Sequence, residues 1–236
     1  MKETLKEKKP YYLTLTRKFI FYLVSLLLAY VIIRLIFDEN ARTGRLLFYI
    51  AQFVGMLIVL RLSKFIEDRF HFKVPYLLDF SLITFAFCGF ILGDTFDFYG
   101  KFPIWDSILH TFSGILIAYV GFIVIRYLDQ EYRIPLSISP MFMSVIVVSV
   151  ALSLGAMWEI GEYLVDDITG ANNQQYMATT RGTLYSKEDQ PLLGHEALKD
   201  TMKDLMLDLA GAVFVASVGY HQLQKRKEEG EAQIKG

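Results

Sequence analysis

Cysteine is nearly absent from this chain of 236 residues, which contains a single one, Cys88, inside an apolar run. One cysteine excludes an intrachain disulfide framework, a CxxC redox pair and a thiolate-rich zinc site. The chain also lacks an excess of either charge, because 24 Lys and Arg residues stand against 25 Asp and Glu residues. It therefore offers no overall basic field, and we expect no nucleic-acid partner.

Polar residues are in the minority as well, since 53% of the residues are apolar. About 20 helical residues, at a rise of about 1.5 Å each, cross the hydrocarbon layer of about 30 Å. Six stretches reach this length, at residues 19–37, 46–66, 74–94, 106–126, 141–163 and 204–222. The fifth is the clearest, because Met141–Trp158 carries no charge and Pro140 stands where a first helical residue can lie. The sequence predicts an all-α fold, a polytopic membrane bundle of about six transmembrane helices.

The distribution of basic residues predicts the orientation of this bundle. Lys and Arg are about twice as frequent on the side of the N-terminus, so the positive-inside rule places both termini in the cytoplasm. We expect a basic N-terminal tail at 1–18, a transmembrane domain at 19–222 and a charged cytoplasmic tail at 223–236. An Asn- and Gln-rich connection at about 168–199 should lie outside. These features predict a multi-pass protein of the cell (inner) membrane, with the lipid bilayer as its partner.

Acidic residues gather at those ends of the later helices that face outward in this topology. Asp106 lies one turn before His110, and Asp204 lies one turn before Asp208, so each pair occupies one face of its helix. Ionised side chains are costly against lipid, so these faces should line the bundle interior or a wet cavity. The candidate metal ligands are Asp106, His110, Glu159, Glu162, Asp200, Asp204 and Asp208. Small residues that would let the helices approach there are Gly114, Gly155, Ala210, Gly211 and Ala212.

Carboxylates packed this closely repel one another, at roughly 3 kcal/mol for two of them about 6 Å apart at an effective dielectric of about 20. Protons or nearby lysines could balance the charge, and a divalent cation could do so better. Oxygen ligands with one imidazole suit Mg²⁺, Mn²⁺, Ca²⁺, Fe²⁺ or Zn²⁺. The sequence predicts a divalent metal cofactor, with His110 and Asp106 as the candidate catalytic residues.

At these residues the chain resembles a known family. The pattern of Asp106, His110 and Gly114, the pair Glu159 and Glu162, and the segments 200–204 and 209–212 resemble the YjdF-like bacterial inner-membrane proteins. The resemblance covers roughly residues 75–220 and implies a membrane protein without assigning it a reaction. A looser similarity links the chain to VanZ-like membrane proteins, which also carry an Asp and a His about one turn apart in a helical hairpin.

Three functions are compatible with this sequence. The first is a metal site that opens outward and acts on a lipid-linked phosphate, with Arg181 and Lys187 of the outer connection near the head group. The second is a transporter for an ion or for protons, in which the same acids bind a cationic substrate reversibly. The third is a non-catalytic scaffold, in which the acids and His110 only hold the helices together.

Overall fold

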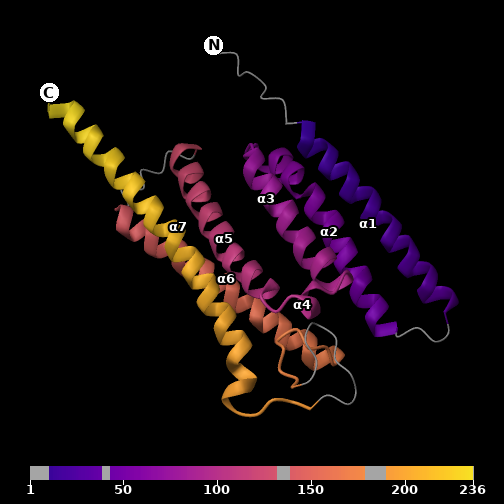
Figure 1. Cartoon of the computed structure of the whole chain (residues 1–236). Coiled ribbons are helices and arrows are strands. Elements are labelled where there is room, and N and C mark those ends of the chain that lie inside the picture. Colours follow the sequence, from indigo (N-terminus) through magenta and orange to yellow (C-terminus); the bar gives the residue numbers. More distant parts are fainter. Residues whose placement is uncertain (1–10, 39–42, 132–138, 179–189, 236) are drawn as a thin grey trace. The chain divides into compact units, whose positions relative to one another are not determined.

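The computed structural model describes residues 11–38, 43–131, 139–178 and 190–235. In these ranges the regular elements are helices, and the pairing of strand type is one bridge between Met177 and Pro191. The helices are α1 (Tyr11–Phe37), α2 (Thr43–Phe70), α3 (Tyr76–Ala86), the π-helix η1 (Phe87–Thr95), α4 (Phe98–Lys101), α5 (Trp105–Glu131), α6 (Pro140–Thr169) and α7 (His195–Lys235). The predicted all-α fold is confirmed (Figure 1).

Among the described residues, five helical segments are long and apolar enough to cross a membrane. They are Tyr11–Phe37, Thr43–Phe70, Tyr76–Thr95, Trp105–Leu128 and Pro140–Ile168. A helical membrane bundle is therefore confirmed. The sixth predicted span, 204–222, is helical within α7 but is not one of these five, because Asp204 and Asp208 reduce its apolar character. A membrane crossing by α7 and the cytoplasmic termini stay predictions.

The ends of α6 have specific local causes. The side chain of Ser139 caps the first turn by accepting a hydrogen bond from the Phe142 N–H, and Pro140 occupies the first helical position as predicted. At the other end, Gly170 adopts a left-handed φ of 67° and donates its N–H to the carbonyl of Asp166. The chain leaves the helix sharply at this glycine.

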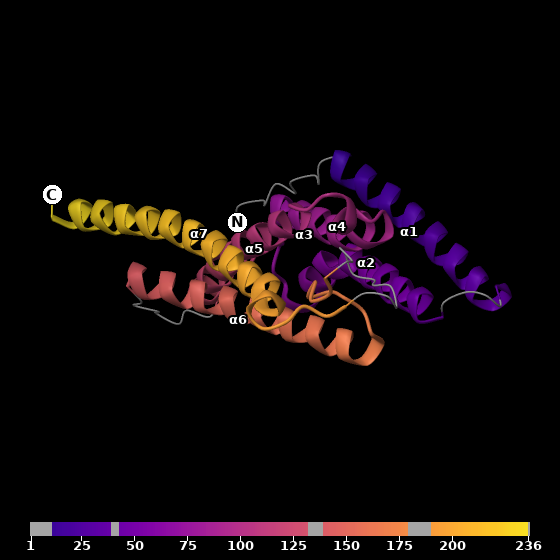
Figure 2. The ribbon, with the colours of Figure 1, turned by 60° about the horizontal axis from the view of Figure 1, so that its bottom comes forward.

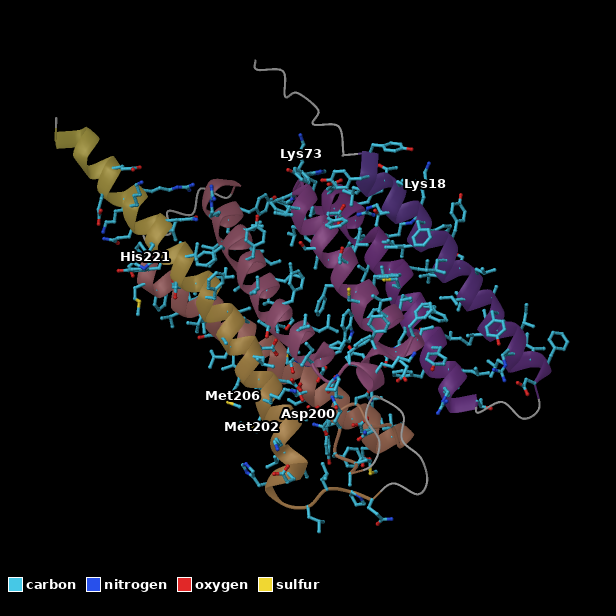
Figure 3. All side chains as sticks on the ribbon, viewed as in Figure 1. Lys18, Lys73, Asp200, Met202, Met206 and His221 are labelled. Atoms are coloured by element: carbon cyan, nitrogen blue, oxygen red, sulfur yellow. The ribbon has the colours of Figure 1, made fainter. Side chains whose placement is uncertain are left out.

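The chain divides into two compact units, Met1–Phe96 and Asp97–Gly236, and each is described by itself. In the first unit, α1, α2, α3 and η1 pack around buried side chains that include Val24, Phe53 and Ile83. Lys18 and Lys73 lie at the same end of this unit (Figure 3). The alternating course of α1 and α2 places these two basic residues at one end, whereas the orientation of that end in the membrane stays a prediction.

The second unit consists mainly of α5, α6 and α7, each of which contacts the other two. Figure 2, like Figure 1, shows α7 beside α5 and α6. The described core between them is made of small residues, with Ala118, Ala151 and Ala212 fully buried beside Val147. Small side chains allow the three backbones to approach closely, as in other membrane bundles.

Glycines mark the points of closest approach. A Cβ on Gly114 would collide with the backbone of Asp208, and a Cβ on Gly211 would collide with the carbonyl of Thr111. On α6, a Cβ on Gly155 would collide with the Asp208 carboxylate. The prediction that these three glycines let the helices approach is confirmed. The backbone of Asp208 thus lies against Gly114, and its buried carboxylate lies against Gly155.

Candidate metal centre

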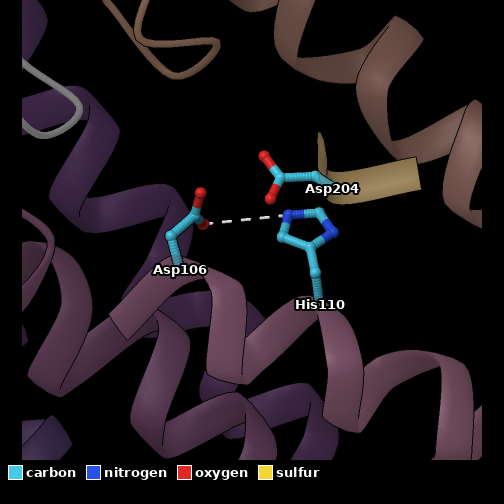
Figure 4. A group of neighbouring side chains, drawn as sticks. All are labelled: Asp106, His110 and Asp204. Atoms are coloured by element: carbon cyan, nitrogen blue, oxygen red, sulfur yellow. Dashed lines mark ion pairs between the residues drawn. The ribbon is translucent and has the colours of Figure 1, made fainter. Parts of the chain in front are cut away.

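Three elements of the second unit supply the cluster. Asp106 and His110 lie one turn apart at the start of α5, Glu159 lies in the second half of α6, and Asp204 lies near the start of α7. Asp106, His110 and Asp204 each direct one ligand atom into a common space, and these three atoms lie within 4.8 Å of one another (Figure 4). We call Asp106, His110, Glu159 and Asp204 the acid cluster.

His110 lies at the centre of this arrangement and is only 7% exposed. Its Nε2 atom lies 3.7 Å from Oδ1 of Asp106 and 3.8 Å from Oε1 of Glu159. Figure 4 shows this side of the ring turned toward Asp106 and Asp204. The Nδ1 atom lies on the other side, 3.2 Å from Oδ2 of Asp208. An ionised carboxylate can only accept, so Nδ1 is the donor in this hydrogen bond, and in the neutral form of the ring the lone pair lies on Nε2.

Asp208 differs from the acid cluster because its oxygens have partners. It is 1% exposed, and it receives hydrogen bonds from the imidazole of His110 and from the hydroxyl of Ser113. Because Gly155 has no side chain, the Oδ2 atom of Asp208 can occupy the space beside it. Asp208 therefore fixes the orientation and tautomer of His110.

Glu159 and Asp204 are buried without sufficient partners. Glu159 is 4% exposed, and neither of its carboxylate oxygens accepts a hydrogen bond of ordinary geometry among the described residues, although the hydroxyl of Thr201 lies near enough to interact with it. Asp204 is 2% exposed, and its Oδ1 atom likewise has no hydrogen bond. Leaving a buried polar group unpaired typically costs about 1–3 kcal/mol, and more when the group is charged. A proton or a cation could satisfy these oxygens.

The remaining two predicted ligands lie at the edge of the cluster. Glu162 is partly buried and accepts a hydrogen bond from the indole Nε1 of Trp158 at 2.8 Å. Asp200 lies one turn before Asp204, and its Oδ1 atom is 3.7 Å from the amine of Lys203. Figure 3 shows Asp200 on the side of α7 opposite Met202 and Met206, which are largely exposed. The set of three ligand atoms within 4.8 Å of one another contains neither carboxylate, nor that of Glu159, which belongs to the acid cluster through its distance of 3.8 Å to Nε2 of His110.

Burial and nearby charges change the pKa of Asp200. Burial, followed by the negative charge of Asp106, raises the pKa of Asp200 to about 7, although the amine of Lys203 opposes this shift. Lys203 also lies 3.9 Å from Oδ1 of Asp204. One amine thus offsets part of the negative charge at the solvent side of the cluster.

The connection after α6 contributes a residue that the sequence did not single out. The amide Nε2 of Gln175 lies 3.2 Å from Oδ2 of Asp106 and donates a hydrogen bond to it. The Asn- and Gln-rich composition of 172–175 was the available signal. The connection runs from Gly170 to Gly194, because α7 begins at His195, before the predicted loop end at 199. Arg181 and Lys187 lie outside the described residues.

Comparisons with known proteins identify the family. The family model described as "Predicted membrane protein (DUF2238)" matches residues 19–225, so the chain belongs to this family. An "Uncharacterized protein" of Thermotoga maritima is 24% identical over 165 residues, which cover 68% of this chain and 71% of that protein. No solved structure matches the chain. These matches support a membrane protein family, whereas the YjdF-like and VanZ-like resemblances stay predictions.

Proposed function

We propose that this member of the DUF2238 family binds a divalent metal ion in its second unit. The ligands are the carboxylates of Asp106, Glu159 and Asp204 and the Nε2 atom of His110. The observation that carries the proposal is the pair of buried carboxylates beside the His110 imidazole: neither oxygen of Glu159 nor the Oδ1 atom of Asp204 accepts a hydrogen bond of ordinary geometry among the described residues. Protein interiors pair their buried charges or use them to coordinate metals.

The other predicted ligands have supporting roles in this proposal. Asp208 holds Nδ1 of His110, as carboxylates commonly do for metal-binding histidines, where their loss typically costs about 10–100-fold in metal affinity. Asp200 and Glu162 tune the charge around the ion from the edge. Three carboxylates and one imidazole favour Mn²⁺, Fe²⁺, Zn²⁺ or Mg²⁺ over soft metals, which prefer thiolates.

The substrate class that fits this site best is the phosphate of a membrane lipid. Asp106 is the second residue of the membrane-spanning segment Trp105–Leu128, so the site lies near the level at which lipid head groups begin. Lys203, with 41% of its side chain exposed, can contact an anion from the aqueous side. A bound metal would supply charge neutralisation of the phosphate, and His110 or Asp106 could move a proton.

Metal content of the purified protein tests the first part. Wild-type protein in detergent is loaded with Mn²⁺, freed of excess ion and measured by elemental analysis, beside His110→Ala, Asp204→Asn and Asp208→Asn. We expect about one ion per chain in the wild type, none in the first two variants and weakened binding in the third. Glu196→Gln is the matched control, because Glu196 lies on the same helix as Asp204 but is exposed and pairs with Lys199. A metal-free wild-type protein would overturn the proposal.

Vesicle experiments test the substrate class. Wild-type protein and His110→Ala are reconstituted into vesicles that contain a polyprenyl diphosphate, and inorganic phosphate is measured with and without Mn²⁺. Release of phosphate that requires both the metal and His110 supports a lipid phosphatase. Proton-linked or metal-ion flux without phosphate release would instead support the transporter function. Reduced thermal stability of the variant, with neither activity in the wild type, would support the scaffold function.

A further inference from the structure

The connection after α6 folds back onto the acid cluster through two successive glutamines. Gln175 donates its amide hydrogen to Oδ2 of Asp106 on α5, at 3.2 Å. Gln174 donates its amide hydrogen to the hydroxyl of Thr201 on α7, at 3.0 Å. The loop therefore contacts two of the three helices that carry cluster residues, α5 and α7. It does so with neutral amide groups, which add no further charge to the cluster.

An anchor on α6 fixes this part of the loop. Asp166 is 4% exposed and accepts hydrogen bonds from the backbone N–H of Asn173 at 2.8 Å and of Gln174 at 3.0 Å. It also accepts one from the side-chain amide of Asn173 at 2.6 Å. Asn172 is fully buried, and its side-chain oxygen accepts the N–H of Met177 at 3.1 Å. The turn is thus held from both sides of Gln175.

The backbone of Gln175 is itself unusual. Its φ of 49° lies in the left-handed region, which a residue with a Cβ adopts only at an energetic cost. Such conformations persist where the surrounding structure imposes them, and they occur preferentially at functional sites. Here the hydrogen bonds to Asp166 and Asn172 impose the conformation. The result is that the Gln175 amide points at Asp106.

The two oxygens of Asp106 have different neighbours as a result. Oδ2 receives the Gln175 amide hydrogen, whereas Oδ1 lies 3.7 Å from Nε2 of His110, on the side of the proposed metal. We propose that Gln175 is a positioning residue of the metal centre. It engages one oxygen of Asp106 and so presents the other to the ion. This inference rests on the proposed metal site and extends that site to the loop after α6.

Two neighbouring glutamines provide a matched test. Mn²⁺ affinity of the full-length protein in detergent is measured by the electron paramagnetic resonance signal of free Mn²⁺, for the wild type, Gln175→Leu and Gln174→Leu. We expect Gln175→Leu to weaken binding about 10–100-fold, as for other residues that orient metal ligands. Gln174→Leu loses a comparable hydrogen bond of the same loop, but to Thr201, and should bind Mn²⁺ almost as the wild type does.

A second variant tests whether Asp166 positions Gln175. Asp166→Ala removes the acceptor that holds the turn, so it should weaken Mn²⁺ binding, and combining it with Gln175→Leu should add little further loss. Equal affinities of the wild type and Gln175→Leu would overturn the inference while leaving the proposed metal site intact. Equal losses in Gln175→Leu and Gln174→Leu would also overturn it, because the loop would then be only structural. A wild type that binds no Mn²⁺ would overturn both proposals.

Discussion

Asp204→Asn provides the sharpest test of whether the acid cluster exists to bind a cation. Asp204 is 2% exposed, and one of its carboxylate oxygens lies within 4.8 Å of a carboxylate oxygen of Asp106. Two carboxylates about 5 Å apart, at an effective dielectric of about 20, repel each other by roughly 3.3 kcal/mol when both are ionised, and protonation of either one reduces this repulsion. The imidazole of His110 and the amine of Lys203 offset only part of this, because the cluster contains more acids than bases.

Without metal, Asp204→Asn should therefore be more stable than the wild type. Asparagine has the same shape, and the Oδ1 atom that it replaces accepts no hydrogen bond. We expect a gain of about 1–3 kcal/mol, the usual cost of one unsatisfied buried group. With Mn²⁺ at about 100 times its dissociation constant, the wild type should gain about 2.7 kcal/mol, and the variant should gain almost none.

Thermal unfolding of the detergent-purified protein, in EDTA and in Mn²⁺, measures both effects. The order of the melting temperatures in EDTA should be variant above wild type, and Mn²⁺ should reverse it. Glu196→Gln, the exposed control on α7, should follow the wild type in both buffers. A variant that melts below the wild type in EDTA would refute the reasoning, because Asp204 would then hold the helices together without a metal.

Three further predictions follow from other contacts. Arg17→Leu leaves the buried Asp79 without its cation and should destabilise the protein by about 3–5 kcal/mol. The double variant Arg17→Leu/Asp79→Leu should melt at a higher temperature than Arg17→Leu. The opposite order would contradict a buried ion pair. Gly155→Ala pushes a methyl group against Asp208 and should lower Mn²⁺ affinity, so unchanged binding would show that the helices can move apart. Because the pKa of Asp200 is raised to about 7, the folded protein retains there a proton that the unfolded chain loses near pH 4. The free energy of unfolding without metal should thus fall as the pH rises from about 4 to 7, whereas the Mn²⁺ affinity should rise. Melting curves and Mn²⁺ titrations at pH 5 and pH 8 check these two expectations. Asp200→Asn should flatten the dependence of stability on pH.

Helical spacing was sufficient to predict the centre of the site. Asp106 and His110, four residues apart, do share one face of α5, and the start of α7 does bring Asp204 beside them. Counting residues along a helix gives the depth of a side chain, because each residue adds about 1.5 Å. It does not give the rotation of each helix about its axis. Glu162, one turn from Glu159, therefore stays a predicted ligand, and the structure adds that it accepts a hydrogen bond from Trp158.

The loop contribution could not be predicted in the same way. Gln175 reaches Asp106 only because Asp166 and Asn172 fold the turn between them, and these contacts involve no periodic pattern. Asp166 illustrates the difficulty, since it continues the acidic face of α6 in the sequence but is used to cap the following turn. Its seven-residue separation from Asn173 becomes informative only when the exit of the chain at Gly170 is known.

The buried carboxylates of the two units differ in their hydrogen-bond partners, and this difference supports the cation proposed for the second unit. In the first unit, Asp79 lies on α3 and receives both the guanidinium of Arg17 and the hydroxyl of Ser63, so that one acid joins three helices. That is the arrangement expected when a buried charge serves packing alone. In the second unit, Asp208 is paired in a similar way. One oxygen of Asp79 and one of Asp204 lack a hydrogen bond, whereas Glu159 is buried to a similar degree with neither oxygen hydrogen-bonded among the described residues. A bundle that needed Glu159 only for packing would gain stability by replacing it with an apolar or amide side chain, so its position beside His110 supports the proposed cation site.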